Sequence, residues 1–231
     1  MQKTVTILAC LCMILGVLPE AVTTVQAQAG PYLAMAPLKE YLIPQATEIA
    51  LARSAAPASI ADHATVLVLG PQGYTTAVQG TNGFVCDVER SWANDTDSPQ
   101  FWNPKMRGPN CFNPEAAKRV VPIYEMKTRL VLAGKSRTEI AQAIAAALGS
   151  GALASPAGGG MCYMMSKQQY LNDQGKNWHP HVMFYAAGDV ASDWGGNLQG
   201  SPMIAVHDPE SRLTTFMIVL PRWSDGTPDL Q

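Results

Sequence analysis

Short apolar runs separated by turn signals dominate residues 65–89. The run Thr65–Leu69 is apolar and β-branched, and after a Gly-Pro-Gln-Gly turn it is followed by Tyr74–Gln79, which has strand composition. An Asn-Gly turn then leads into Phe84–Glu89. This order predicts a β-hairpin and a third antiparallel strand next to it.

A helical pattern precedes these strands and a loop-like segment follows them. Gln45–Arg53 consists of good helix formers within an Ala-rich segment, and Pro44 suits the first turn of a helix there. Trp92–Asn113 is crowded with Pro, Asn, Asp and Gly, and this composition predicts a long ordered loop.

Two further helices have start signals in the sequence. Asn113 followed by Pro and Glu matches an N-cap, a proline at the first helical position and an acid in the first turn. It predicts a helix that runs toward Leu132 with a break near Pro122. Ser136 and Glu139 have the spacing of a capping box, which predicts a second helix directly after the first.

The C-terminal third contains three strand-like runs. Methionines at helical spacing predict a short helix over Met161–Leu171, and His181–Ala186, Met203–His207 and Leu213–Leu220 then read as strands. Three strands, then helices, then three strands predict an α+β fold. We expect an antiparallel sheet of about six strands, three N-terminal and three C-terminal, with helices packed on one face.

The N-terminal segment has the pattern of a secretory signal peptide. Lys3 precedes an uncharged apolar run, Thr4–Pro19, and small residues end in Val25-Gln26-Ala27. The run is shorter than the roughly 20 residues that cross a bilayer, so no permanent membrane span is expected. We expect residues 1–27 to be a signal peptide, residues 28–231 to form a single globular domain, and the protein to be periplasmic or secreted.

Composition and charge narrow the classes of partner. The 231 residues are 47% apolar and 15% charged, which excludes a disordered polyelectrolyte. The net charge of −2 provides no clustered basic surface, so nucleic acid is not an expected partner.

Cleavage of the signal would leave three cysteines in an oxidising compartment, where disulfides persist. We predict that Cys86 and Cys111 are bonded to each other, which would anchor the Trp- and Pro-rich loop to a strand. Cys162 is then the free thiol.

Three C-terminal histidines are candidate metal ligands. In an extended chain His179, His181 and Met183 share one face, and His207 ends the next strand-like run. If those strands pair, the three imidazoles could converge on a metal ion, and the added methionines would favour a soft ion such as Cu(I). The alternative is that these histidines are hydrogen-bonded in a polar pocket or lie on the surface.

Cys162 is the candidate nucleophile. It would begin the predicted helix after a run of glycines, where helix N-terminal amides favour a thiolate. With His181 as base and His207 or Asp208 orienting it, the order of residues resembles that of cysteine peptidases of the NlpC/P60 and papain type. No Asp-Cys-Ser-Gly motif surrounds the thiol, and a buried unpaired cysteine is the alternative.

Two other groups have a functional and a structural interpretation. Asp87 and Glu89 lie opposite Cys86 and Val88 on one strand, either as a carboxylate pair for acid–base work or as a solvated strand face. Four loop residues could stack on sugars or peptides, or could be folded under as a satellite core: Trp92, Phe101, Trp102 and Arg107.

Five groups of residues across most of the chain resemble an uncharacterised family of bacterial secreted proteins. They are Gly83-Phe-Val-Cys86 with Glu89-Arg-Ser-Trp92, Pro109-Asn-Cys-Phe-Asn-Pro114, Cys162-Tyr-Met-Met-Ser-Lys-Gln168, Trp178-His-Pro-His181 with Met183-Phe-Tyr185, and Trp223-Ser-Asp-Gly-Thr-Pro228. The resemblance implies export and a bacterial origin and transfers no catalytic residue.

These patterns favour an exported binding or accessory module of the periplasm or cell envelope. Its partner would be a small molecule or an envelope component, and no cofactor signature occurs in the sequence. Two alternatives remain open: a cysteine-type hydrolase that uses Cys162 and His181, and a metal-binding protein that uses His179, His181 and His207.

Overall fold

The computed structural model describes residues 31–155 and 158–231. The predicted signal peptide, residues 1–27, lies outside the described residues. Within the described ranges, no helix combines the length and the apolar character that a membrane crossing requires.

In the residues that the structure describes, one mixed sheet of eight strands organises the fold, in the order β2-β1-β3-β4-β5-β6-β8-β7. The strands are β1 (Thr65–Gly70), β2 (Gly73–Val78), β3 (Val85–Glu89), β4 (Gly108–Phe112), β5 (Gly160–Met164), β6 (His181–Ala187), β7 (Met203–Asp208) and β8 (Leu213–Val219). All neighbours are antiparallel except β1 and β3, which are parallel. The prediction of six antiparallel strands was therefore wrong in strand number and in this one pairing.

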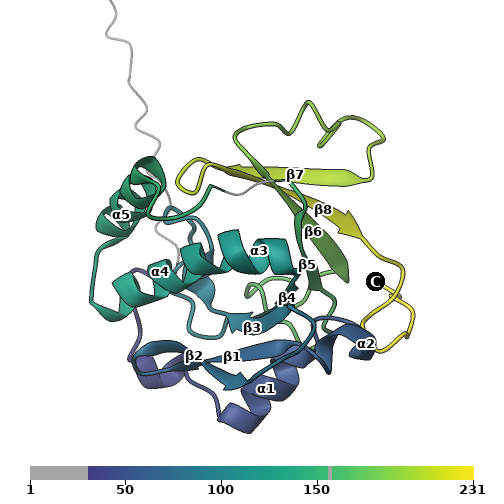
Figure 1. The fold of residues 1–231 in the computed structure, drawn as a ribbon, viewed down its shortest axis with the longest axis horizontal. Helices are drawn as coiled ribbons and strands as arrows, with labels where there is room; N and C mark the ends of the chain where they lie inside the picture. Colours follow the sequence, from purple (N-terminus) through teal and green to yellow (C-terminus); the bar gives the residue numbers. More distant parts are fainter. Residues whose placement is uncertain (1–30, 156–157) are drawn as a thin grey trace, which may run out of the picture.

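Helices lie on both faces of the sheet, so the prediction of one covered face was also wrong. They are α1 (Gln45–Arg53), α2 (Ala58–Ala61), α3 (Pro114–Arg119), α4 (Val121–Leu132) and α5 (Arg137–Ser150), with short 3-10 turns η1 (Leu38–Glu40) and η2 (Ser91–Ala93). Figure 1 shows α1 on one side of β1 and β3, and α3 and α4 on the other. The reason is the apolar run of β1: Val66 packs in the cluster of α1, and the next residue, Leu67, packs in the cluster of α3 and α4.

The helix start signals are confirmed. The Asn113 side chain accepts a hydrogen bond from the Ala116 amide at 2.9 Å, with a proline in the first turn of α3. The helical segment breaks at Val120, between α3 and α4. Ser136 and Glu139 form the complete capping box of α5.

Two segments were predicted wrongly: one expected in a loop and one expected as a helix are both strands. Gly108–Phe112 is β4, although it belongs to the predicted loop, and Gly160–Met164 is β5, although its methionines have helical spacing. Each has partners on both sides: β4 pairs with β3 and β5, and β5 pairs with β4 and β6. These partners are distant in sequence, so tertiary pairing overrides local propensity.

The face that carries α3 and α4, called the α4 face below, is unusually polar for a covered surface. Strand pairing places the following side chains on it: Asp87 and Glu89 of β3, Asn110 of β4, Cys162 and Met164 of β5, His181, Met183 and Tyr185 of β6, and Thr215 and Met217 of β8. This face therefore carries the buried acids, the thiol and the imidazole of the described residues that are candidates for function.

The predicted disulfide between Cys86 and Cys111 is present. The two residues face each other across β3 and β4, are fully buried, and are 25 positions apart in the chain.

Replacing both cysteines by alanine should lower the free energy of unfolding by about 3 kcal/mol, because the unfolded chain is then no longer constrained by a closed loop. Urea denaturation of the variant measures this loss, and an unchanged midpoint would contradict it.

Candidate functional site

A cavity of about 230 Å³ lies on the α4 face, next to the end of β3. Its wall is mainly apolar and is formed by four methionines, a leucine and a tryptophan: Met106, Met164, Met183, Met217, Leu171 and Trp178. Two ionisable side chains, Glu89 and His181, also line it. We call it the methionine cavity.

The absence of a side chain in β4 contributes to this cavity. Gly108 pairs with Glu89, and a Cβ at this position would lie 3.0 Å from Cε of Met164 and 3.8 Å from Cδ2 of Leu171. Any larger residue at position 108 would therefore protrude into space next to the methionine cavity. A Cβ there would also lie 3.7 Å from Cβ of Glu89.

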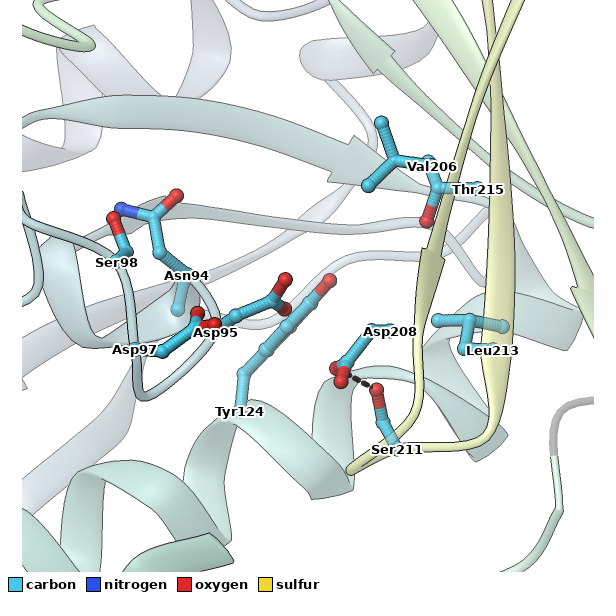
Figure 2. A pocket seen from close by; sticks show the side chains of 11 residues that line it. Asn94, Asp95, Asp97, Ser98, Tyr124, Val206, Asp208, Ser211, Leu213 and Thr215 are labelled. Carbon is cyan, nitrogen blue, oxygen red and sulfur yellow. Dashed lines mark hydrogen bonds between the residues drawn. The ribbon is translucent and has the colours of Figure 1, made fainter. Parts of the chain in front are cut away.

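A second cavity, of about 260 Å³, lies farther along the same face. Three carboxylates line it, from Asp95, Asp97 and Asp208, together with neutral polar groups that include Ser98 and Ser211. Figure 2 shows Asp95 and Tyr124 on one side of this space and Asp208 on the other. We call it the acidic cavity.

The two cavities adjoin each other. Ala93, Asn94 and Tyr124 line both of them. On the sheet side, Met217 lines the methionine cavity and Thr215 lines the acidic cavity. These are consecutive residues on one face of β8, and two residues of a strand span about 7 Å. The two adjoining cavities, together called the cleft below, lie between the C-terminal strands and the loop after β3.

Glu89 and Asp87 are buried carboxyl groups, and each has an oxygen atom without a hydrogen bond from the described residues. Glu89 is 8% exposed and Asp87 is 1% exposed, and one oxygen of each, Oε1 and Oδ1, has no hydrogen-bond partner among the described residues. Burial raises the pKa of Glu89 well above its usual range, and the neighbouring Asp87 raises it further. Burial also raises the pKa of Asp87, to about 8, although Arg90 opposes this shift. Burial thus favours the neutral, protonated form of both groups.

His181 is the second ionisable group that lines the methionine cavity. Its Nδ1 lies 2.7 Å from the carbonyl oxygen of His179, and because a carbonyl only accepts, Nδ1 carries the proton. Burial lowers the pKa of the ring, so Nε2 is left as an unprotonated acceptor. The ring of Trp178 packs edge-on against it, with centroids 4.8 Å apart. Glu89 can donate a hydrogen bond and His181 can accept one within the same apolar wall.

The acidic cavity is only partly neutralised by a buried lysine. Nζ of Lys127, from α4, lies 3.9 Å from carboxylate oxygens of Asp208 and of Glu210, and 3.3 Å from the carbonyl of Asn94. Burial, followed by the charge of Asp208, raises the pKa of Asp95 to about 6. Asp95 is still mostly ionised at neutral pH, so the cavity carries excess negative charge.

The structure does not arrange Cys162 as an activated nucleophile. It lies in the middle of β5 instead of at a helix N-terminus, and it is fully buried. Its Sγ contacts the Tyr185 hydroxyl at 3.1 Å and the Asn110 amide oxygen at 3.5 Å. Burial raises the pKa of the thiol well above its usual value, which disfavours a thiolate. Since β5 pairs Cys162 with Met183 and Met164 with His181, the thiol and the imidazole are only diagonal neighbours.

Native Cys162 should therefore resist alkylation. We expect iodoacetamide at pH 8 to leave it unmodified in the folded protein and to label it once the protein is unfolded in denaturant. Mass spectrometry of the labelled peptides measures the rate. Labelling of the folded protein at the rate of a free thiol would contradict the buried position.

The three candidate histidines are not brought together. His181 begins β6. His179 lies in the preceding loop, and its Nδ1 is 2.5 Å from Oδ2 of Asp229. His207 pairs with Thr214 and lies on the face opposite His181. Within residues 31–155 and 158–231, no group of three His, Cys, Asp or Glu side chains could hold a metal ion.

The other two candidate groups have different outcomes. Asp87 and Glu89 are buried beneath α4, so they do not form a solvated strand face. The aromatic loop residues Trp92, Phe101 and Trp102 are buried in a cluster with Tyr41 and residues of α4 and α5. They form a satellite core and not a stacking platform.

Sequence reasoning missed the residues that close the cleft. Tyr124 is on α4 and Asp95 follows η2, and neither belongs to a chemical motif in the sequence. The sequence did contain one signal for the site: the alternation in His181–Tyr185, which predicted that His181 and Met183 share one face of this strand. Comparisons of the chain with protein-family models, curated proteins and solved structures gave no match.

Proposed function

We propose that this protein is an exported binding module of the periplasm or cell envelope, and that its ligand is a small molecule held in the methionine cavity. The N-terminal pattern of the sequence and the disulfide between Cys86 and Cys111 support export. The cavity is of a size for a ligand of about ten non-hydrogen atoms, and apolar walls with a few placed polar groups are typical of such sites.

One observation carries the proposal: Glu89, a buried carboxylic acid with one oxygen that has no hydrogen-bond partner among the described residues, lines an apolar cavity that the imidazole of His181 also lines. An unpartnered buried polar group costs stability, on the order of 1–3 kcal/mol. A ligand with a hydroxyl group can remove this cost, because the hydroxyl oxygen can accept a hydrogen bond from Glu89. The preferred ligand is therefore an apolar molecule with a hydroxyl or a similar group.

A binding role fits the site better than hydrolysis by Cys162. The thiol is buried, its pKa is raised, and its sulfur contacts Tyr185 and Asn110 instead of a base. In the methionine cavity, in contrast, polar groups and space for a ligand occur together.

The test uses 4-ethylphenol and ethylbenzene as probes, since they differ only in the hydroxyl group. With methionine methyl groups labelled with ¹³C, 4-ethylphenol should shift the signals of Met164, Met183 and Met217. Met126 and Met203, which pack in other clusters, serve as internal references. We expect 4-ethylphenol to bind about tenfold more tightly than ethylbenzene.

The variant Glu89→Met removes the polar anchor while keeping the site apolar. It should abolish the preference for 4-ethylphenol over ethylbenzene and should leave ethylbenzene bound. The matched control is Glu40→Met, at an exposed position of η1. Absence of any shift at the cavity methionines with either probe would overturn the proposal.

A further inference from the structure

The acidic cavity has more carboxylates than cations near it. Asp95, Asp97 and Asp208 line the cavity, and Glu210 approaches Lys127 together with Asp208. In the part of the chain that the structure describes, Lys127 is the one cation within ion-pair distance of these four carboxylates. The neighbourhood thus holds up to four negative charges and one positive charge.

Arg137 lies nearby but does not neutralise this cavity. Its Nη1 donates to the carbonyl oxygens of Thr96 and Ser98, each at 3.1 Å, and its guanidinium stacks on the rings of Phe101 and Trp102. Arg137 therefore stabilises the backbone of this loop through the carbonyl groups of Thr96 and Ser98. Asp95 has no hydrogen-bond partner for its side chain among the described residues, and it is half-buried at the cavity wall.

A second observation points to a ligand in the same cleft. Glu89 is more than nine-tenths buried, its Oε1 has no hydrogen-bond partner among the described residues, and it lines the adjoining methionine cavity. Along β8 the two cavities are one side-chain position apart, about 7 Å. One molecule with an apolar end and a polar end can therefore occupy both.

We propose that the ligand is a small amphipathic organic amine, with its apolar group in the methionine cavity and its ammonium group among the carboxylates of the acidic cavity. This inference rests on the proposed binding function and names the class of its ligand. Measured from the far side of an aromatic ring, a linker of three bonds places the nitrogen about 7 Å away, which matches the distance between the cavities. Tyr124, which lines both cavities, would lie beside this linker.

The test compares three probes that share one ring: tyramine, 4-ethylphenol and 3-(4-hydroxyphenyl)propionate. They carry an ammonium, no charge and a carboxylate at the same end. Calorimetric titration should show tyramine binding about tenfold more tightly than 4-ethylphenol, because a charge-assisted hydrogen bond is added. The propionate should bind more weakly than 4-ethylphenol.

The variant Asp95→Asn removes one cavity charge and keeps the shape of the side chain. It should reduce the affinity for tyramine about fivefold or more and leave that for 4-ethylphenol unchanged, since only the amine reaches this group. Asp62→Asn, at an exposed position after α2, is the matched control and should change neither affinity. Equal affinities for tyramine and 4-ethylphenol would overturn the inference and leave the proposed function standing, whereas no binding of any probe would overturn both.

Discussion

The stability of this protein should fall as the pH rises from 4 to 8, and the variant Asp87→Asn should remove much of that fall. In the folded protein burial raises the pKa of Asp87 to about 8, against 3.8 when it is exposed. Because the folded-state pKa is the higher one, the stabilisation is fully present below pH 3.8 and is lost as the pH rises toward 8. At about 1.4 kcal/mol per unit of pKa, the loss is on the order of 5 kcal/mol.

Other carboxylates have lowered pKa values and stabilise the fold more as the pH rises. The test is therefore the difference in free energy of unfolding between the variant and the wild type at each pH. Hydrogen bonds lower the pKa of Glu139, Asp173 and Asp225 to about 2, and these groups stabilise the fold above their unfolded pKa. Urea denaturation at intervals between pH 4 and pH 8 should give similar stabilities for Asp87→Asn and wild type at pH 4 and a growing advantage for the variant at higher pH. Parallel curves would contradict a buried, neutral Asp87.

Replacing Arg90 by methionine should lower the free energy of unfolding by about 4 kcal/mol. Arg90 is fully buried; it donates to Glu48 at 2.8 Å and to the carbonyl oxygen of Tyr41 at 2.8 Å, and it also contacts the Val88 carbonyl. Glu48 is buried too, and its Oε1 also accepts from the Leu69 amide. Removing one member of a buried ion pair leaves an uncompensated charge, which typically costs 3–5 kcal/mol.

Two further variants separate this charge effect from lost packing. The double variant Arg90→Met with Glu48→Gln should be more stable than Arg90→Met alone by about 2 kcal/mol, because no buried charge is left without its partner. Arg129→Met, at an exposed position of α4, should change stability by less than about 0.5 kcal/mol. A double variant less stable than Arg90→Met would indicate that Arg90 acts mainly through its packing and backbone contacts.

Local signals in the sequence predicted the elements that local interactions stabilise. The N-cap at Asn113 and the capping box of Ser136 and Glu139 act within one helical turn, so their effect does not depend on the rest of the fold. The strands β4 and β5 depend on partners far along the chain. Their sequences, one with Gly and Pro and one with methionines at helical spacing, therefore gave the wrong local prediction.

For the candidate site too, the sequence predicted local features but not the relation between distant residues. Period-two alternation correctly placed His181 and Met183 on one face of a strand, and Met203, Ala205 and His207 on one face of another. It did not determine how these faces are related. The register of β6, β8 and β7 places His207 on the side opposite His181, which separates the proposed metal ligands.

By itself, the sequence determined the helix starts, the disulfide partners and the side-chain alternation within each strand, because these depend on neighbours a few residues apart or on a small choice of cysteines. Only the tertiary structure decided that Asp87 and Glu89 are buried and that Asp95 and Tyr124 face the cleft. The covering helix α4 begins more than thirty positions after β3. Burial and cavity shape arise from packing between such distant segments, and the energy of that packing has no local signature in the chain.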